Sequence, residues 1–119
     1  MKRIAPLALL GAFCFNGILA LPGFASPDES VECSVVEEND KIIRCTYAST
    51  RMPEARTVVF YWNSETTPQD DRERRFVMPA GHGSVYDYRY YYGRAPGLWQ
   101  VRVADEAGTT LAETSFTLE

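Results

Sequence analysis

The chain has 119 residues, 45% of them hydrophobic, which is enough for one small domain. Its formal net charge is −4, so it lacks the excess of positive charge that binding to nucleic acid or anionic lipid requires. We therefore expect neither as a partner.

The first 25 residues have the features of a signal peptide. Lys2 and Arg3 form a short positive region, and residues 4–21 are strongly apolar. Gly23 and Ala25 then stand at the −3 and −1 positions of a cleavage site. Cleavage leaves a mature chain with 10 basic and 16 acidic residues, in the periplasm or secreted and with no membrane span. An uncleaved membrane anchor is the alternative.

The mature chain opens with a predicted disulfide-linked hairpin. Residues 26–30 are polar and are expected to be a disordered leader, and the domain is expected to cover 31–119. Residues 31–36 and 41–48 alternate as strands do, and the four polar residues between them suit a turn. This register places Cys33 opposite Cys45. Exported proteins meet an oxidising compartment, so we expect these two cysteines to form a disulfide.

Three further strands are predicted in the middle of the chain, at 56–62, 72–78 and 84–92. The first is rich in β-branched and aromatic residues on both parities, which indicates a central strand covered at least partly on each side. Polar loops containing proline separate these strands.

The stretch 93–118 predicts the closing hairpin. Trp99, Val101 and Val103 alternate with polar residues, and the turn Asp105–Gly108 leads into a returning strand. Leu111 and Phe116 have opposite parity, so we expect a β-bulge between Ala112 and Ser115. About seven short strands with no helical period predict an all-β antiparallel sandwich.

The C-terminal pattern resembles the closing hairpin of bacterial exported immunoglobulin-like modules. The residues that carry the resemblance are Gly97, Trp99, Val101, Val103, Asp105, Gly108, Leu111 and Phe116. It implies an immunoglobulin-like sandwich; many such modules are accessory or binding domains of uncharacterised function, and the resemblance carries no function with it. Antibody-type domains differ, because their disulfide joins distant strands on either side of a tryptophan, whereas Cys33 and Cys45 both precede Trp62.

A stripe of tyrosines predicts either a core face or a contact surface. Tyr86, Tyr88, Tyr90 and Tyr92 share one parity, and Val85, Asp87, Arg89 and Tyr91 share the other. We expect the stripe to face the core, because burying an aspartate and an arginine instead is the more costly arrangement. The outward surface would then be a binding site made of Arg89, Tyr91 and Arg94, with Arg74 and Arg75 adjacent.

The sequence offers few side chains that could form a catalytic or a metal-binding site. The one histidine, His82, lies between two glycines and is read as a turn residue. Asp70 and Asp71 could form a carboxylate pair, but three nearby arginines favour a solvated charged surface. Met78 and His82, with Met52, could bind copper(I), although the register of Met78 favours the core.

The sequence thus predicts a non-enzymatic exported module that binds another envelope or secreted protein, without a cofactor and with no metal site. Two alternatives are an inhibitor of a secreted hydrolase such as lysozyme, since an acidic chain suits a cationic target, and a periplasmic copper-binding protein.

Overall fold

The computed structural model describes residues 4–6 and 29–119. Most of the predicted signal peptide (1–3 and 7–25) and residues 26–28 of the predicted leader lie outside the described residues. Ser30 already belongs to a strand and pairs with Ala48, so the first strand begins earlier than the sequence indicated. Within the described residues, no helix is long and apolar enough to cross a membrane.

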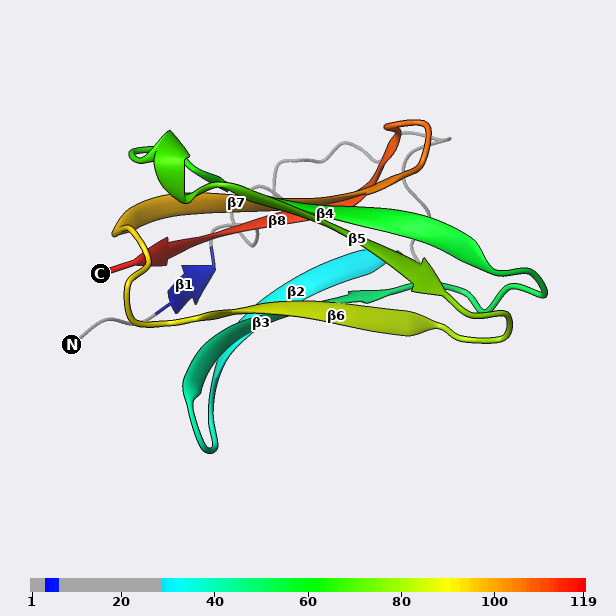
Figure 1. The fold of residues 1–119 in the computed structure, drawn as a ribbon, viewed down its shortest axis with the longest axis horizontal. Coiled ribbons are helices and arrows are strands. Elements are labelled where there is room, and N and C mark those ends of the chain that lie inside the picture. The colour runs from blue at the N-terminus through cyan, green and yellow to red at the C-terminus, as the bar shows by residue number, and fades with distance from the viewer. Residues whose placement is uncertain (1–3, 7–28) are drawn as a thin grey trace, which may run out of the picture.

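Two antiparallel sheets make up the fold (Figure 1). The smaller sheet has the order β2-β3-β6, formed by β2 (Ser30–Glu37), β3 (Lys41–Ala48) and β6 (Ser84–Tyr90). The larger sheet has the order β1-β8-β7-β4-β5, formed by β1 (Ile4–Pro6), β4 (Arg56–Ser64), β5 (Arg72–Met78), β7 (Gly97–Asp105) and β8 (Thr110–Leu118). One 3-10 turn, η1 (Pro68–Asp70), connects β4 to β5.

The predicted all-β antiparallel sandwich of about seven strands is therefore confirmed. Strands β2 to β8 form it, and the short β1 adds to the edge of β8. The fourth strand of the sandwich, β5, pairs with β4 in the larger sheet. In antibody constant domains the fourth strand instead lies in the sheet of the first, second and fifth strands. This places β5 and β6 at sheet edges on the same side of the sandwich (Figure 1).

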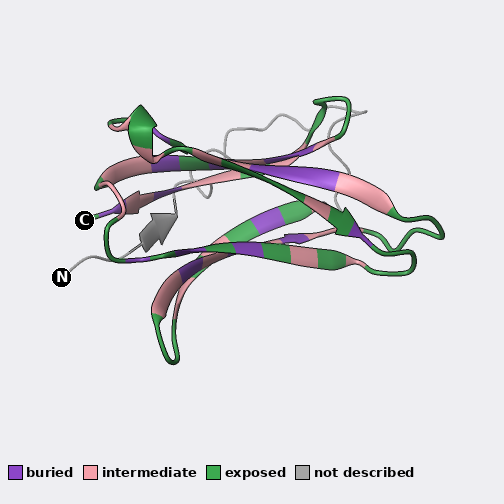
Figure 2. Cartoon of the chain, viewed as in Figure 1, coloured by how far each residue is buried: buried purple, intermediate pink, exposed green. Residues whose placement is uncertain are grey.

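The core lies between the sheets and is rich in aromatic side chains. Its largest fully buried members are Trp62, Trp99, Tyr47, Tyr91, Phe60 and Phe116. More buried and less buried positions alternate along much of β3, β6 and β7, as one-sided burial requires (Figure 2). Strand β4 departs from this alternation as its sequence predicted, because it lies inside its sheet and both Val58 and Val59 are buried.

The first hairpin is closed by the predicted disulfide. Cys33 and Cys45 are directly opposed in the β2–β3 register, their Cα atoms are 4.0 Å apart, and their sulfur atoms are bonded. Such a short Cα separation belongs to a non-hydrogen-bonded pair of an antiparallel ladder. The bond therefore joins the two strands at a point where no backbone hydrogen bonds hold them.

The predicted bulge exists, but its predicted position is wrong. Val103 pairs with Ala112 and Ala104 pairs with Thr110, so Leu111 is the extra residue. From Ala112 onward the register is regular. An extra residue anywhere between Leu111 and Phe116 would bring both side chains to the same face of the strand. Their parity alone therefore could not locate the bulge. The structure puts it beside the turn, where Gly108 has a positive φ of 94°.

Candidate functional site

Strand β6 presents its tyrosines to solvent. Tyr86, Tyr88 and Tyr90 are 52%, 43% and 55% exposed, and Tyr92, just beyond the strand, is 70% exposed. These four residues are called the tyrosine face below. Asp87 and Arg89, on the other parity, are buried. The parity prediction is confirmed, but the expectation that the stripe faces the core is wrong.

The orientation follows from the partners that Asp87 finds between the sheets. Its carboxylate accepts hydrogen bonds from Trp62 Nε1 at 2.8 Å, from Arg72 at 3.0 Å and from the backbone N–H of Tyr88 at 2.9 Å. Arg74 approaches the same carboxylate at 3.8 Å. A buried charge that is paired and hydrogen-bonded escapes most of the desolvation cost that the sequence argument assigned to it.

Arg89 is held in the same way from the neighbouring loop. Its guanidinium donates to the backbone carbonyl of Asp70 at 2.6 Å and to the carboxylate of Asp70 at 3.1 Å. It also lies 5.8 Å from the Trp62 ring and 5.5 Å from the Trp99 ring. Burial, followed by the positive charge of Arg94, lowers the pKa of Arg89, and Asp70 opposes that shift.

The predicted binding residues Arg89 and Tyr91 are therefore not on an outward surface. Tyr91 is fully buried, with the ammonium group of Lys41 4.1 Å from its ring centroid. Arg94 is mostly buried and pairs with Asp70 at 3.3 Å. The prediction failed because it placed this whole parity outside, whereas the side chains on it complete the core and its ion pairs.

The two remaining predicted residues lie on opposite faces of β5. Arg74 has the parity of Arg72 and lines a pocket together with Arg89 and Arg94. Arg75 has the other parity and approaches Glu106 at 3.8 Å on the rim of the larger sheet. The structure thus brings together three of the five predicted residues, and separates Arg75 and Tyr91 from them.

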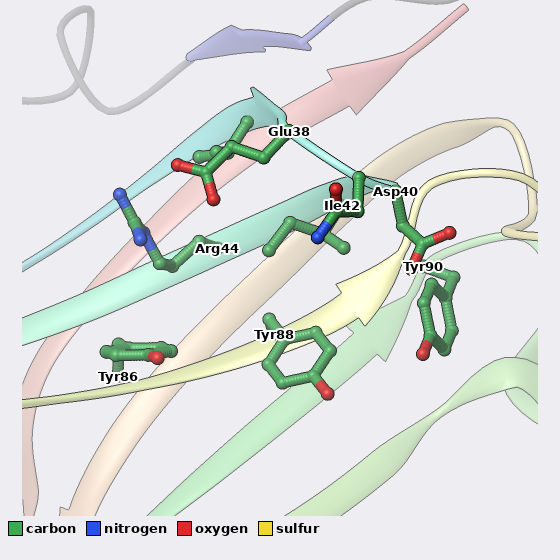
Figure 3. Close-up of a pocket in the computed structure, with 9 residues that line it drawn as sticks. Glu38, Asp40, Ile42, Arg44, Tyr86, Tyr88 and Tyr90 are labelled. Atoms are coloured by element: carbon green, nitrogen blue, oxygen red, sulfur yellow. The ribbon is translucent and has the colours of Figure 1, made fainter.

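The tyrosine face borders a shallow hollow on the outer side of the smaller sheet. The hollow has a volume of about 230 Å³, and Val36, Glu38, Asn39, Asp40, Ile42, Arg44, Tyr86, Tyr88 and Tyr90 line it. Figure 3 shows that these side chains come from the β2–β3 hairpin and from β6. Tyr88 and Tyr90 meet edge to face at 6.0 Å, and Arg44 lies 5.4 Å from the Tyr86 ring. Exposed aromatic and aliphatic groups, rimmed by charges of both signs, form a surface suited to contact.

The structure does not bring the candidate catalytic or copper-binding residues together into a site. Asp70 and Asp71 have separate structural partners, since Asp71 accepts from the backbone N–H of Ser64 at 2.7 Å. Met78 is buried in the core, whereas His82 is exposed in the turn after β5. Among the described residues, no three or more His, Cys, Asp or Glu side chains gather as a metal site would require.

Sequence reasoning missed Arg72, which connects the two sheets. Besides its bonds to Asp87, it donates to the backbone carbonyl of Tyr88 at 2.8 Å, at the edge of β6 that faces β5. It also missed Ile42 and Arg44 beside the tyrosines. Their parity relative to Cys45 was available, and it assigns both to the outer face once the pairing of β3 with β6 is known.

Comparisons with known proteins give no relative: no family model, curated protein or solved structure matches this chain.

Proposed function

We propose that this protein is a non-enzymatic exported module that binds another protein of the bacterial envelope through the tyrosine face. The observation that carries the proposal is the exposure of four tyrosines on one rigid strand and its end. Tyrosine combines a large contact area with a polar group and few rotatable bonds, and it is enriched at the energetic centres of protein interfaces. Export is supported by the leader pattern of the sequence and by the disulfide.

The sheet beneath the tyrosine face is held in place before any partner arrives. Strand β6 pairs with β3 along its whole length, and the Cys33–Cys45 disulfide fixes β3 to β2. On the other side, Arg72 and Asp87 tie β6 to β5. A preorganised surface loses less conformational entropy on binding, so exposed side chains on it contribute more affinity.

Photo-cross-linking in intact cells tests the proposal. A photoreactive amino acid replaces Tyr88, and we expect it to form a discrete adduct with an envelope protein. The matched control is the same replacement at Tyr61, a partly buried tyrosine of the larger sheet that contacts Arg102. No adduct at position 88, or the same adducts at positions 88 and 61, would contradict the proposal.

Substitutions then show whether the tyrosines provide the affinity. Against the partner identified by cross-linking, Tyr88→Ser combined with Tyr90→Ser should weaken binding by about a thousandfold, because central aromatic side chains contribute about 2 kcal/mol each and about 1.4 kcal/mol corresponds to a factor of ten. The double variant should retain the thermal stability of the wild type within a few degrees, since both side chains are exposed. Unchanged affinity would rule out this face as the contact.

Inhibition of a cationic secreted hydrolase such as lysozyme is a second candidate, favoured by the tip of the first hairpin. Glu37, Glu38 and Asp40 are exposed there, and Figure 1 shows this hairpin extending away from the rest of the sandwich. A disulfide-linked hairpin with an acidic tip is suited to a positively charged cleft.

Activity assays on mixing with lysozyme decide this second candidate. The wild type should inhibit at low salt, and Glu38→Lys combined with Asp40→Lys should abolish inhibition. Glu106→Lys combined with Glu113→Lys, which makes the same change in net charge on the exposed part of the β7–β8 hairpin, is the control and should retain it. Full lysozyme activity with the wild type would eliminate the candidate.

A further inference from the structure

A second pocket lies between β5 and β6, which are edge strands of the two sheets. Its volume is about 140 Å³, and it is lined by Arg72, Arg74, Tyr88, Arg89, Tyr90 and Arg94. These residues come from β5, β6 and the loop after β6. The pocket is therefore assembled from segments that are distant in sequence, and its wall is arginine and tyrosine alone.

The charges of this pocket are only partly balanced. Asp87 pairs with Arg72 and lies 3.8 Å from Arg74, and Asp70 pairs with Arg89 and Arg94. In the part of the chain that the structure describes, four guanidinium groups thus share two carboxylates, which leaves two positive charges in excess around a pocket of a net acidic protein. Mutual repulsion in such a cluster is relieved by a bound anion.

Two of the arginines that line the pocket also carry unsatisfied donors. The Nε–H groups of Arg72 and Arg89 are buried and have no hydrogen-bond partner within the described part of the chain. Arg89 is only 7% exposed, so this donor is removed from bulk water as well. Buried donors without a partner are costly, and they add to the positive potential behind the wall of the pocket.

We propose that this pocket binds a dianionic phosphate group. Two excess positive charges match a phosphate in its doubly ionised form, and planar guanidinium groups provide paired donors for its oxygens. The rings of Tyr88 and Tyr90 form an aromatic wall beside the charges, so an aryl or sugar phosphate fits better than the bare ion. This site goes beyond the proposed protein contact and stands without it, although the two share Tyr88 and Tyr90.

Calorimetric titration at constant ionic strength and pH 8 tests the proposal. The ligands are inorganic phosphate, phenyl phosphate, phenyl sulfate and benzoate, since a phosphate monoester with a second pKa of about 6 is then dianionic and the last two are monoanions. Phenyl phosphate should bind with a submillimolar Kd, roughly tenfold or more tighter than either monoanion. Inorganic phosphate, which lacks the ring, should bind more weakly than phenyl phosphate. No saturable binding of either phosphate, or equal binding of all four ligands, would overturn the proposal.

Two arginine variants place the site. Arg74→Gln and Arg94→Gln should each raise the Kd of phenyl phosphate by roughly tenfold, because each removes a charged donor. Arg75→Gln is the matched control, since it lies on the opposite face of β5 and should change the Kd less than twofold. Circular dichroism verifies that each variant is folded. If folded Arg74→Gln and Arg94→Gln proteins bind like the wild type, phosphate does not occupy this pocket.

Discussion

Asp87 determines which side of β6 faces the core. It is 2% exposed, and its partners come from β4 and β5 in the opposite sheet. With this carboxylate bound between the sheets, Tyr86 and Tyr88 must point to solvent because neighbouring residues of a strand alternate in direction. The buried carboxylate of Asp87, together with the Arg89–Asp70 pair, thus accounts for the exposure of the tyrosine face.

Replacing that carboxylate should destabilise the fold. Asp87→Asn removes the counter-ion of Arg72 and points an amide donor toward other donors, so we expect the free energy of unfolding to fall by about 3 kcal/mol. Urea denaturation measures the loss. Glu113→Gln, an exposed change on β8, is the control and should shift the free energy by no more than about 0.5 kcal/mol. A comparable shift in both variants would show that Asp87 has no special role.

Tyr47 gives the protein a pH dependence in the alkaline range. Burial, and then its hydrogen bond to Glu29 at 2.8 Å, raises its pKa from 10.0 to about 12. Between these values the folded chain keeps a proton that the unfolded chain has lost, so the free energy of unfolding falls as pH rises from 10 to 12. In Tyr47→Phe this decline should be shallower, as measured by urea denaturation across the window. Equal slopes in the two proteins would contradict the assignment.

The β2–β3 hairpin is the element that the sequence described most completely. Alternation, turn residues and the two cysteines all fixed the same register, and the structure pairs Cys33 with Cys45 as expected. The β7–β8 hairpin was predicted in outline, but its bulge was misplaced because parity does not locate an extra residue. Local patterns determine a hairpin well when a covalent constraint accompanies them.

Removing the disulfide should weaken this element without abolishing it. Cys33→Ala combined with Cys45→Ala restores the freedom of a short loop in the unfolded chain, so we expect the free energy of unfolding to fall by about 3 kcal/mol. Urea denaturation of the double variant measures this loss. A reducing agent should produce the same loss in the wild type and none in the double variant. A loss below about 1 kcal/mol would mean that the hairpin is equally constrained when unfolded.

At the scale of the whole molecule, the sandwich was predictable and the site was not. Strand patterns gave the fold class, because each depends on residues close in sequence. The orientation of β6 depends on Trp62, Arg72 and Asp70, which approach it only after the two sheets pack. The sequence does not reveal these partners, so the desolvation cost of burying Asp87 and Arg89 was overestimated. The tyrosines were therefore assigned to the wrong side of the strand.

In the folded molecule, basic and acidic side chains cluster in different places. Although the chain is acidic, four arginines line the pocket between the edge strands β5 and β6. The acidic hairpin tip lies at the end of β2 and β3. Net charge therefore excludes a broad basic surface, but it says little about one small site that the fold assembles from distant segments.

Mapping tyrosine reactivity tests the central claim, which is that the tyrosine side chains of β6 point to solvent. With a nitrating reagent and mass spectrometry on the native protein, Tyr86, Tyr88, Tyr90 and Tyr92 should be modified rapidly, whereas Tyr47 and Tyr91 should react only after unfolding. Rapid nitration of Tyr91 together with protection of Tyr86 and Tyr88 would show that the strand is turned the other way.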